Sequence, residues 1–460
     1  MTLTIVNMIP KSLSGERQQD SEPNIAVNPA NPMQIVGTAF TPDPAHGPQA
    51  PIYVSNDGGA TWSLRSIVPG GEATADISVA YATQGGTLYA GILNWSTFNL
   101  NILRVADPFG PYPMTALVDR PDEDQPWVTA QTDANKDHVF VTHNDFSASP
   151  KTATVELSAN ARTAGAPAGF KRHVLERRTT LGQDGPPVRT AVHPSGVVYG
   201  AFHRWRRVVK STNTALDVRM DVCVVRDDDL GGGQTPFREL KDSGDQFAGV
   251  RVGKNRLVHF TASVGPLGFE RIGADLSIAV DPANEAHVWL AWCDRVGGLQ
   301  SRDWTMHVRH STDKGRHWSA DVRTIKQAKN PALAVNDSGV VGLLYQQVVG
   351  TGPTARWRTR LELTDDAWAT NPTSFVLHRA LASSPKRQFL PYIGDYIRLV
   401  TVGSEFYGVF SGSNLPDMAN FPNGVTYQRN ANFTTHTLLR NDGVTPVPVS
   451  IDPFFVRYAP

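Results

Sequence analysis

Pairs of short apolar runs, each pair separated by a polar turn, recur along the whole chain. The first pair covers 22–27 and 33–40, and the turn between them at 28–32 reads Asn-Pro-Ala-Asn-Pro. A nearly residue-for-residue copy pairs 274–280 with 286–293, roughly 250 positions later. Apolar runs of this length, bounded by Asn, Asp, Pro and Gly, are typical of β-strands joined by turns. Each pair therefore predicts an antiparallel hairpin.

Looser copies of this hairpin fill the rest of the chain. They pair 76–82 with 87–93, 124–131 with 138–143, 188–193 with 197–202, 332–335 with 340–345, and 392–400 with 406–410. The resulting seven hairpins are spaced roughly 50–60 residues apart, with one longer gap. Further strand-like runs follow them, for example at 153–157, 217–225 and 356–363. Four antiparallel strands at this period are the signature of a β-propeller blade.

We therefore expect residues 1–460 to form a single all-β domain, a β-propeller of seven four-stranded blades. A six-bladed propeller is the alternative, if one hairpin is misassigned. The longer gap, at about 226–273, predicts the outer strands of the fourth blade together with an insertion. Because an open sheet edge is costly, the first and last blades must join, and we expect the terminal runs 2–8 and 447–458 to pair and close the ring.

Two further turns share the spacing Ser-x-Asp-x-Gly-x-x-Trp, at 55–62 and 311–318. An Asp side chain can accept hydrogen bonds from backbone N–H groups just ahead of it, and Gly adopts the positive φ that such a turn needs. The Trp then provides a large apolar side chain that folds back on the hairpin. Both copies are predicted to be structural turns between the outer strands of their blades.

These turns resemble the Asp-boxes of BNR repeats, so the chain is similar to the sialidase-like β-propeller superfamily. The phrases at 24–29, 124–128 and 394–397 also resemble repeats of many bacterial BNR-type proteins. The resemblance covers essentially the whole chain and implies a propeller that binds or cleaves glycans.

The resemblance does not extend to the substrate-binding segment of sialidases. Sialidases carry an early Phe/Tyr-Arg-Ile-Pro segment whose Arg binds the substrate carboxylate, and the segment 16–23 has none. The arginines Arg189, Arg204, Arg295 and Arg398 and the tyrosines Tyr392 and Tyr396 do not match the family pattern in order. The resemblance therefore does not imply sialidase activity itself.

A candidate site follows from the topology of a blade. The start of its first strand and the end of its second lie at the same end of the hairpin, and propeller sites commonly lie around the channel at this end. Acidic residues gather near the predicted first-strand starts, namely Glu22, Asp76, Asp124, Asp184, Asp275 and Asp395. We predict that the catalytic residues are Asp124, His143, Asp184, His203, Arg204, Asp275 and Asp395.

The residue types in this group suit several roles. Paired carboxylates can act as acid and base on a glycosidic bond, and a His can remove a proton in a lyase reaction. Alternatively, each Asp caps a turn, both His residues are structural, or the ring of acids holds a cation. No other cofactor is expected.

Two functions therefore remain open. One is an enzyme, a glycosidase or polysaccharide lyase of the sialidase-like superfamily. The other is a non-catalytic propeller that binds a glycan or a protein, or serves as a scaffold in an assembly. In both cases the expected partner is a carbohydrate or another polar ligand.

Composition narrows the choice of partner and compartment. Lys+Arg and Asp+Glu are both 43, so a nucleic-acid partner is not expected. A local basic patch is predicted from 171–173, 177–178 and 204–210, where the alternative is a solvated surface. No apolar run approaches the roughly 18 residues of a membrane span. The segment 1–10 lacks a signal-peptide pattern, so we expect a cytoplasmic protein or export by another route. The two Cys residues lie in apolar runs and are expected to be buried free thiols.

Overall fold

A computed structural model describes residues 1–40, 51–70, 73–163, 169–181, 187–212, 215–265, 268–272, 276–301, 303–385 and 393–460. Nearly all regular structure is β-strand, with short 3-10 helices η1 (Lys11–Leu13), η3 (Gly352–Thr354) and η4 (Met418–Asn420). The strands form seven sheets of four or five strands and one small three-stranded sheet. Within the described ranges, no helix is both long and apolar enough to cross a membrane.

The first three blades each contain four strands in sequence order. Blade 1 consists of β2 (Ser21–Val27), β3 (Ile35–Phe40), β4 (Ile52–Ser55) and β5 (Ser63–Arg65). Blade 2 consists of β6 (Thr74–Tyr81), β7 (Leu88–Asn94), β8 (Leu100–Val105) and β9 (Thr115–Arg120). Blade 3 consists of β10 (Glu123–Asp133), β11 (Lys136–Asp145), β12 (Thr152–Ser158) and β13 (Lys171–Val174).

Blades 4 to 6 continue the same order. Blade 4 consists of β14 (Val188–Val192), β15 (Val198–Thr212), β16 (Ala215–Asp227), β17 (Val250–Gly265) and β18 (Gly268–Ile272). Blade 5 consists of β19 (Leu276–Asp281), β20 (Asn284–Val296), β21 (Asp303–Ser311) and β22 (Arg323–Lys326). Blade 6 consists of β23 (Ala328–Val335), β24 (Val341–Val349), β25 (Arg356–Thr364) and β26 (Thr373–Leu381). The stretch 226–273 thus contains the end of β16, the segment 228–249, β17 and β18.

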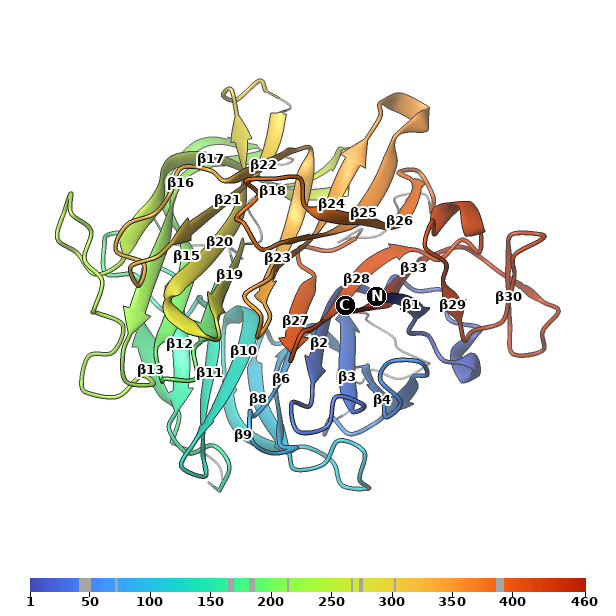
Figure 1. The fold of residues 1–460 in the computed structure, drawn as a ribbon, viewed down its shortest axis with the longest axis horizontal. Coiled ribbons are helices and arrows are strands. Elements are labelled where there is room, and N and C mark those ends of the chain that lie inside the picture. The colour runs from blue at the N-terminus through green and yellow to red at the C-terminus, as the bar shows by residue number, and fades with distance from the viewer. Residues whose placement is uncertain are drawn as a thin grey trace.

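The seven innermost strands form a closed ring around one axis. Each of β2, β6, β10, β14, β19, β23 and β27 contacts the next, and β27 (Arg398–Val402) contacts β2 to complete the circle. Figure 1 shows the blades arranged around this centre. The chain is therefore a seven-bladed β-propeller, which confirms the predicted fold and blade count.

Blade 7 is built from both ends of the chain. Its strand order is β27, β28 (Glu405–Ser413), β33 (Ile451–Ala459), β1 (Thr2–Asn7) and β29 (Thr426–Tyr427). β1 pairs antiparallel with β33 from Thr2 opposite Ala459 to Asn7 opposite Phe454. The predicted closure by the terminal strands is confirmed. The segment between η4 and β33 also contains the small sheet of β30 (Ala431–Asn432), β31 (Thr437–Leu439) and β32 (Pro446–Val447).

A fully buried ion pair fastens this closure. Arg429 Nη1 lies 2.8 Å from Asp452 Oδ2, and neither side chain is exposed. Arg429 Nη2 also donates to the carbonyl oxygen of Ser14 at 3.0 Å. Asp452 accepts from the side-chain amides of Asn7 and Asn414, each at 2.7 Å. One carboxylate therefore links the N-terminal strand, the last strand and the loop between them.

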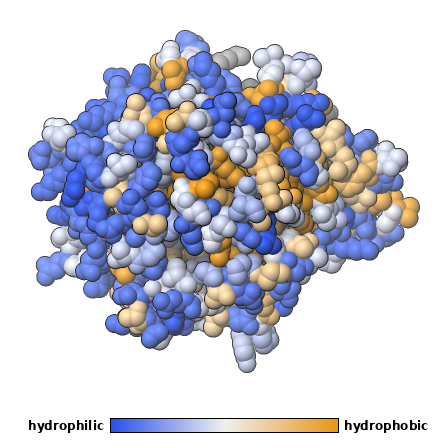
Figure 2. All heavy atoms as spheres, in the orientation of Figure 1, coloured by the Kyte–Doolittle hydropathy of each residue, from blue (hydrophilic) through white to orange (hydrophobic). Residues whose placement is uncertain are grey.

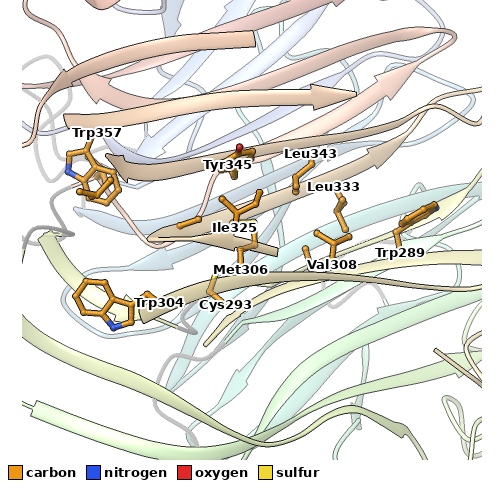
Figure 3. Close-up of a cluster of buried hydrophobic side chains, with 14 of the residues drawn as sticks. Trp289, Cys293, Trp304, Met306, Val308, Ile325, Leu333, Leu343, Tyr345 and Trp357 are labelled. Atoms are coloured by element: carbon orange, nitrogen blue, oxygen red, sulfur yellow. The ribbon is translucent and has the colours of Figure 1, made fainter. Parts of the chain in front are cut away.

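Apolar residues on alternate strand positions fill the spaces between neighbouring blades. In β7, Leu88, Ala90 and Ile92 join the core shared with blade 1, whereas Tyr89 joins the core shared with blade 3. Because both faces of an inner strand are buried, a strand such as β7 reads as a nearly continuous apolar run. Figure 3 shows the largest core, between blades 5 and 6. Cys223 and Cys293 are buried free thiols, as predicted.

The two Ser-x-Asp-x-Gly-x-x-Trp turns form the same set of hydrogen bonds. Ser55 Oγ donates to Asp57 Oδ1 at 2.7 Å, and Ser311 Oγ donates to Asp313 Oδ1 at 2.8 Å. The indole N–H of Trp62 then donates to the carbonyl oxygen of Gly59 at 3.0 Å. The N–H of Gly58 donates to the carbonyl oxygen of Met33, which places this turn at the end of blade 1 opposite to the start of β2.

Blade 6 contains a third turn of this kind that the sequence pattern does not reveal. Thr364 Oγ1 donates to Asp366 Oδ1 at 2.7 Å, and the N–H of Thr370 donates to Asp366 Oδ2 at 2.9 Å. Ala367 and Trp368 have φ values of 58° and 62°, at the two positions that are Gly-Gly in the turn of blade 1 and Lys-Gly in the turn of blade 5. Hydrogen bonding to the Asp thus maintains the turn without Gly.

The substitution Arg429→Met tests the closure. It leaves Asp452 buried without its ionic partner, and removal of one partner of a buried ion pair costs about 3–5 kcal/mol. We expect the free energy of unfolding, measured by urea denaturation, to fall by about that amount. Arg457→Met is the control, because Arg457 pairs with Glu405 on the same blade with both side chains partly exposed. Its loss should be about 0–1 kcal/mol. Equal losses for the two variants would contradict the role of Arg429.

Candidate functional site

Several innermost strands begin with a β-bulge that sets which side chains face the axis. The pairing register shifts between Ser21 and Asn24, and likewise at the starts of β6, β10 and β23. In three of these bulges a residue with positive φ precedes a Pro, namely Glu22, Gln125 and Asn330. Pro has no N–H to donate to the ladder, so it is tolerated at such a bulge. These bulges therefore rotate the start of the strand and fix its register.

The bulges hold neighbouring blades together near the axis. Glu22 is buried, and its Oε1 accepts a hydrogen bond from the N–H of Asp395 at 3.0 Å. Asn330 Nδ2 donates to Gln346 Oε1 at 2.9 Å and to the carbonyl oxygen of Gly394 at 3.1 Å. Gly394 has a φ of 80°, and a Cβ there would clash with Glu22 Cγ and with the backbone nitrogen of Glu22. Only Gly fits between blades 7 and 1 at this point.

One position of the innermost strands recurs around the axis. Asn24 Oδ1 accepts from the N–H of Val79, and Ser78 Oγ accepts from the N–H of Val128, so each links one blade to the next. Ser277 Oγ does the same for blade 6. These hydrogen bonds between blades align the innermost strands of blades 1 to 6. In order, the residues at the shared position are Asn24, Ser78, Trp127, Arg189, Ser277 and Ala332. Trp127 and Arg189 are the large side chains of this set.

Arg398 of β27 extends across the axis to three other blades. Its Nη1 donates to Asn24 Oδ1 at 2.9 Å and to the carbonyl oxygen of Val79 at 3.1 Å. Its Nη2 donates to the carbonyl oxygen of Val128 at 3.3 Å. Burial, and secondarily the charge of Arg189, lower the pKa of Arg398 to about 9. Among the residues that the structure describes, Arg398 forms no ion pair with a carboxylate.

Two aromatic side chains pack against the axial guanidinium groups. The Cζ atoms of Arg189 and Arg398 lie 4.2 and 4.6 Å from the ring centre of Trp127. Tyr396 meets Trp127 edge-on, with ring centres 5.9 Å apart, and lies 5.6 Å from Arg189 Cζ. Burial and the nearby carboxylates of Asp76 and Glu22 raise the pKa of Tyr396 well above its usual value. Tyr396 is therefore a neutral phenol at ordinary pH.

A small axial cavity of about 100 Å³ adjoins these residues. Its polar lining consists of Arg189, Arg398, Thr190, Ser277 and the indole of Trp127. Its remaining lining is apolar and comes from β19, β23, β27 and Ile397 just before β27. No acidic side chain of the described part of the chain lines it. A cavity with two guanidinium groups and no carboxylate is suited to an anion.

The predicted site residues lie in several places. Asp395 is buried beside Glu22, and Asp124 is half-buried at the start of β10, opposite Asn144. Asp184 and Asp275 lie outside the described residues. Throughout the described ranges, no group of three His, Cys, Asp or Glu side chains could hold a metal ion. A catalytic role for these residues stays a prediction.

His143 belongs to a charged cluster inside blade 3. It is fully buried, and its Nδ1 lies 2.6 Å from Glu123 Oε2. Arg172 donates to Glu123, Asp145 and Glu156 at 2.5, 2.8 and 2.8 Å. Burial raises the pKa of Glu123 despite the hydrogen bond from His143. The cluster lies on β10 to β13 and does not line the axial cavity.

His203 and Arg204 lie in blade 4. His203 is fully buried in β15, and Arg204 Nη1 donates to Asp221 Oδ2 at 3.0 Å. Arg204 Nε also lies 3.8 Å from Glu176 Oε2. Burial raises the pKa of Glu176 to about 7, although the Arg178 backbone and two guanidinium groups oppose this shift. Each of the two predicted His residues is buried on the second strand of its own blade, and neither lines the axial cavity.

Sequence reasoning did not single out Trp127, Glu123 or Glu176. It named Arg189 and Arg398 but could not match either of them to a position in the sialidase pattern. One signal exists for part of this set: the residue after the bulge Pro occupies the axial position in Asn24, Trp127 and Ala332. Blades 4 and 7 lack this Pro arrangement, and they supply the two arginines.

The fold and the axial group together define a seven-bladed β-propeller with a positively charged axial cavity. No protein-family model and no curated protein matches the chain. Similar solved structures include the phage phi92 endosialidase, with 11% identity, a TM-score of 0.46, and coverage of 99% of this chain and 68% of that chain. The alpha-L-arabinofuranosidase Arb93A from Fusarium graminearum with an iminosugar inhibitor has 12% identity and a TM-score of 0.42, and the match covers 97% of each chain. YCF48 bound to D1 peptide has 11% identity and a TM-score of 0.42, and the match covers 88% of this chain and 93% of that chain.

The raised pKa of Glu176 predicts a pH-dependent stability. Because its pKa rises from 4.5 to about 7 on folding, its stabilising contribution is present below about pH 4.5 and is lost as the pH rises through 7. At pH 8, Glu176→Gln should therefore unfold at a higher temperature than the unaltered protein. Its free energy of unfolding should be higher by up to about 3 kcal/mol. At pH 4.5 or below the difference between the two proteins should disappear. Thermal melts followed by circular dichroism at each pH measure the melting temperatures of both proteins.

Asp133→Asn serves as the control for this comparison. Asp133 is the exposed last residue of β10, next to the turn that leads to β11. Its substitution should shift the melting temperature by a similar small amount at both pH values. A Glu176→Gln variant that is less stable at pH 8 would show that the carboxylate is stabilised by its Arg neighbours instead.

Proposed function

We propose that the chain is a glycan-binding propeller of the sialidase-like kind and that its axial cavity binds an acidic sugar unit. The observation that carries the proposal is the lining of this cavity, to which the described residues contribute Arg189 and Arg398 and no acidic side chain. The resemblance of the two Ser-x-Asp-x-Gly-x-x-Trp turns to Asp-boxes supports a glycan as the partner.

The electrostatics of Arg398 favour an anion. Its guanidinium is buried, has another guanidinium as its charged neighbour, and forms no carboxylate pair in the described structure. A buried charge without an opposite charge is unfavourable, so a bound carboxylate would lower the free energy of this region. The cavity volume of about 100 Å³ suits a small anionic group, with the rest of a ligand outside it.

Preorganisation supports the same role. Trp127 packs against both guanidinium groups, and Gln125 Oε1 accepts from Arg189 Nη2 at 3.3 Å. Groups that are already held in place lose little conformational entropy when a ligand binds. Arg can also form paired hydrogen bonds with a carboxylate, which gives geometric selectivity.

Cleavage of a glycosidic bond is the second candidate function. It is favoured by the buried carboxyl groups of Glu22, Asp76 and Asp395 around Tyr396. The raised pKa of Tyr396 argues against it, because a nucleophilic tyrosine must lose its proton and burial opposes that loss. Binding is therefore the function that we propose first.

The substitution Arg189→Gln tests the proposed function. Oligosaccharides that end in sialic or uronic acid are compared with their carboxyl-reduced forms, first on an array and then by titration calorimetry. The acidic forms should bind more tightly than the reduced forms. Arg189→Gln should weaken binding of the acidic forms at least about tenfold, because a hydrogen bond to a charged group contributes about 1.5–3 kcal/mol.

Arg256→Gln is the matched control, because Arg256 also packs near a Trp ring but lies away from the axis. The affinity of the Arg256→Gln variant for the acidic oligosaccharides should stay unchanged. Arg398 is unsuitable as a test because it links three other blades. Equal binding of acidic and carboxyl-reduced glycans would refute the proposal. Release of reducing sugar from the same panel would instead establish cleavage, and its loss in Arg189→Gln would place the cleavage at this site.

A further inference from the structure

A second and larger cavity, of about 380 Å³, lies on blade 2, away from the axis. It is bounded by Val68, Pro69 and Gly70 after β5 and by side chains of β6, β7, the connection between β7 and β8, β8 and the end of β9. Its apolar surface comes from Val68, Ile92 and Leu103, which belong to the core or adjoin it. Thr74 starts β6 opposite the end of β7, so the cavity lies at the end of the blade where the innermost strand begins.

A fixed carboxylate stands at the rim of this cavity. The side-chain amides of Asn99 and Asn101 both donate to Asp119 Oδ1, each at 3.0 Å. The second oxygen, Oδ2, accepts no hydrogen bond from any residue in the described ranges. The two amides thereby hold the carboxylate in one orientation and leave one oxygen available to a ligand. The side-chain carbonyl oxygens of Asn99 and Asn101 add further acceptors at the same rim.

Thr74 provides an independent sign of a ligand. It lines the cavity and is only 6% exposed, and its hydroxyl has no hydrogen-bond partner in the part of the chain that the structure describes. A buried hydroxyl without a partner is unfavourable, and such groups are rare in folded proteins. A ligand hydroxyl in the cavity would supply the missing partner.

We propose that this cavity binds a neutral sugar residue. A pyranose or furanose ring presents hydroxyl groups that both donate and accept, together with an apolar C–H surface. Asp119 Oδ2 and the Thr74 hydroxyl match the hydroxyl groups, and Ile92 and Leu103 match the C–H surface. Asp119 repels an anionic ligand, so this site selects against the acidic sugar of the axial cavity. The inference does not depend on the axial site.

The test uses the intact protein and a panel of methyl glycosides of neutral hexoses and pentoses. Saturation-transfer NMR identifies the sugars that bind, and calorimetric titration gives their affinities. Thr74→Val removes the hydroxyl and keeps the shape of the side chain. It should weaken sugar binding about three- to tenfold while the melting temperature stays equal or rises, because a buried hydroxyl without a partner is lost. Asp119→Ala should weaken binding by at least about tenfold.

Matched controls separate this site from general effects. Thr373→Val changes an exposed Thr at the start of β26, and Asp337→Ala changes an exposed Asp in a turn of blade 6. Both controls, and Arg189→Gln, should bind the neutral sugars as the unaltered protein does. The proposal is wrong if no sugar of the panel binds, or if Thr74→Val and Asp119→Ala bind as tightly as the controls. Loss of neutral-sugar binding in Arg189→Gln alone would also overturn it.

Discussion

The buried ion pair between Arg429 and Asp452 is the contact on which the ring of blades depends. Each of the first six blades is a continuous piece of chain that packs against its neighbours, whereas blade 7 must gather β27, β33 and β1 from distant positions. The Asp452 carboxylate is bonded in only one arrangement of these segments, the one that also brings Asn7 and Asn414 to it. A buried charge that is satisfied in one arrangement alone disfavours the alternatives, including an open ring.

The axial cavity is a consequence of this closure. Arg398 enters the axis from blade 7, and its hydrogen bonds end on blades 1, 2 and 3. Those blades come within its reach because β27 and β2 are neighbours in the closed ring. Arg189, from blade 4 on the other side, then shares the face of Trp127 with it. The pairing of the two chain ends therefore assembles a group of like charges that no single blade contains.

The fold could be predicted from the sequence because each blade repeats the same apolar runs and polar turns. The period identifies the blades even where individual residues differ, and edge closure requires the termini to meet. The turn of blade 6 shows where the pattern stops being visible. Thr364 replaces Ser, and Ala367 and Trp368 adopt positive φ without being Gly, yet Asp366 accepts hydrogen bonds from residues at the equivalent positions. A motif based on residue types misses a turn that is maintained by its hydrogen bonds.

The site was less accessible to sequence reasoning because the register at the axis is set by bulges. A shift of one residue moves every side chain of a strand to its other face, so locating the start of a strand does not say which residue faces the channel. Pro marks the register in blades 1, 3 and 6, where the next residue faces the axis. Arg189 and Arg398 lie in blades without that mark, and their register follows from pairing with β15 and β28. The charge of the axis is thus encoded by strand pairing. His143 and His203 are buried inside separate blades, at positions that differ by one residue in the pairing register of the second strand.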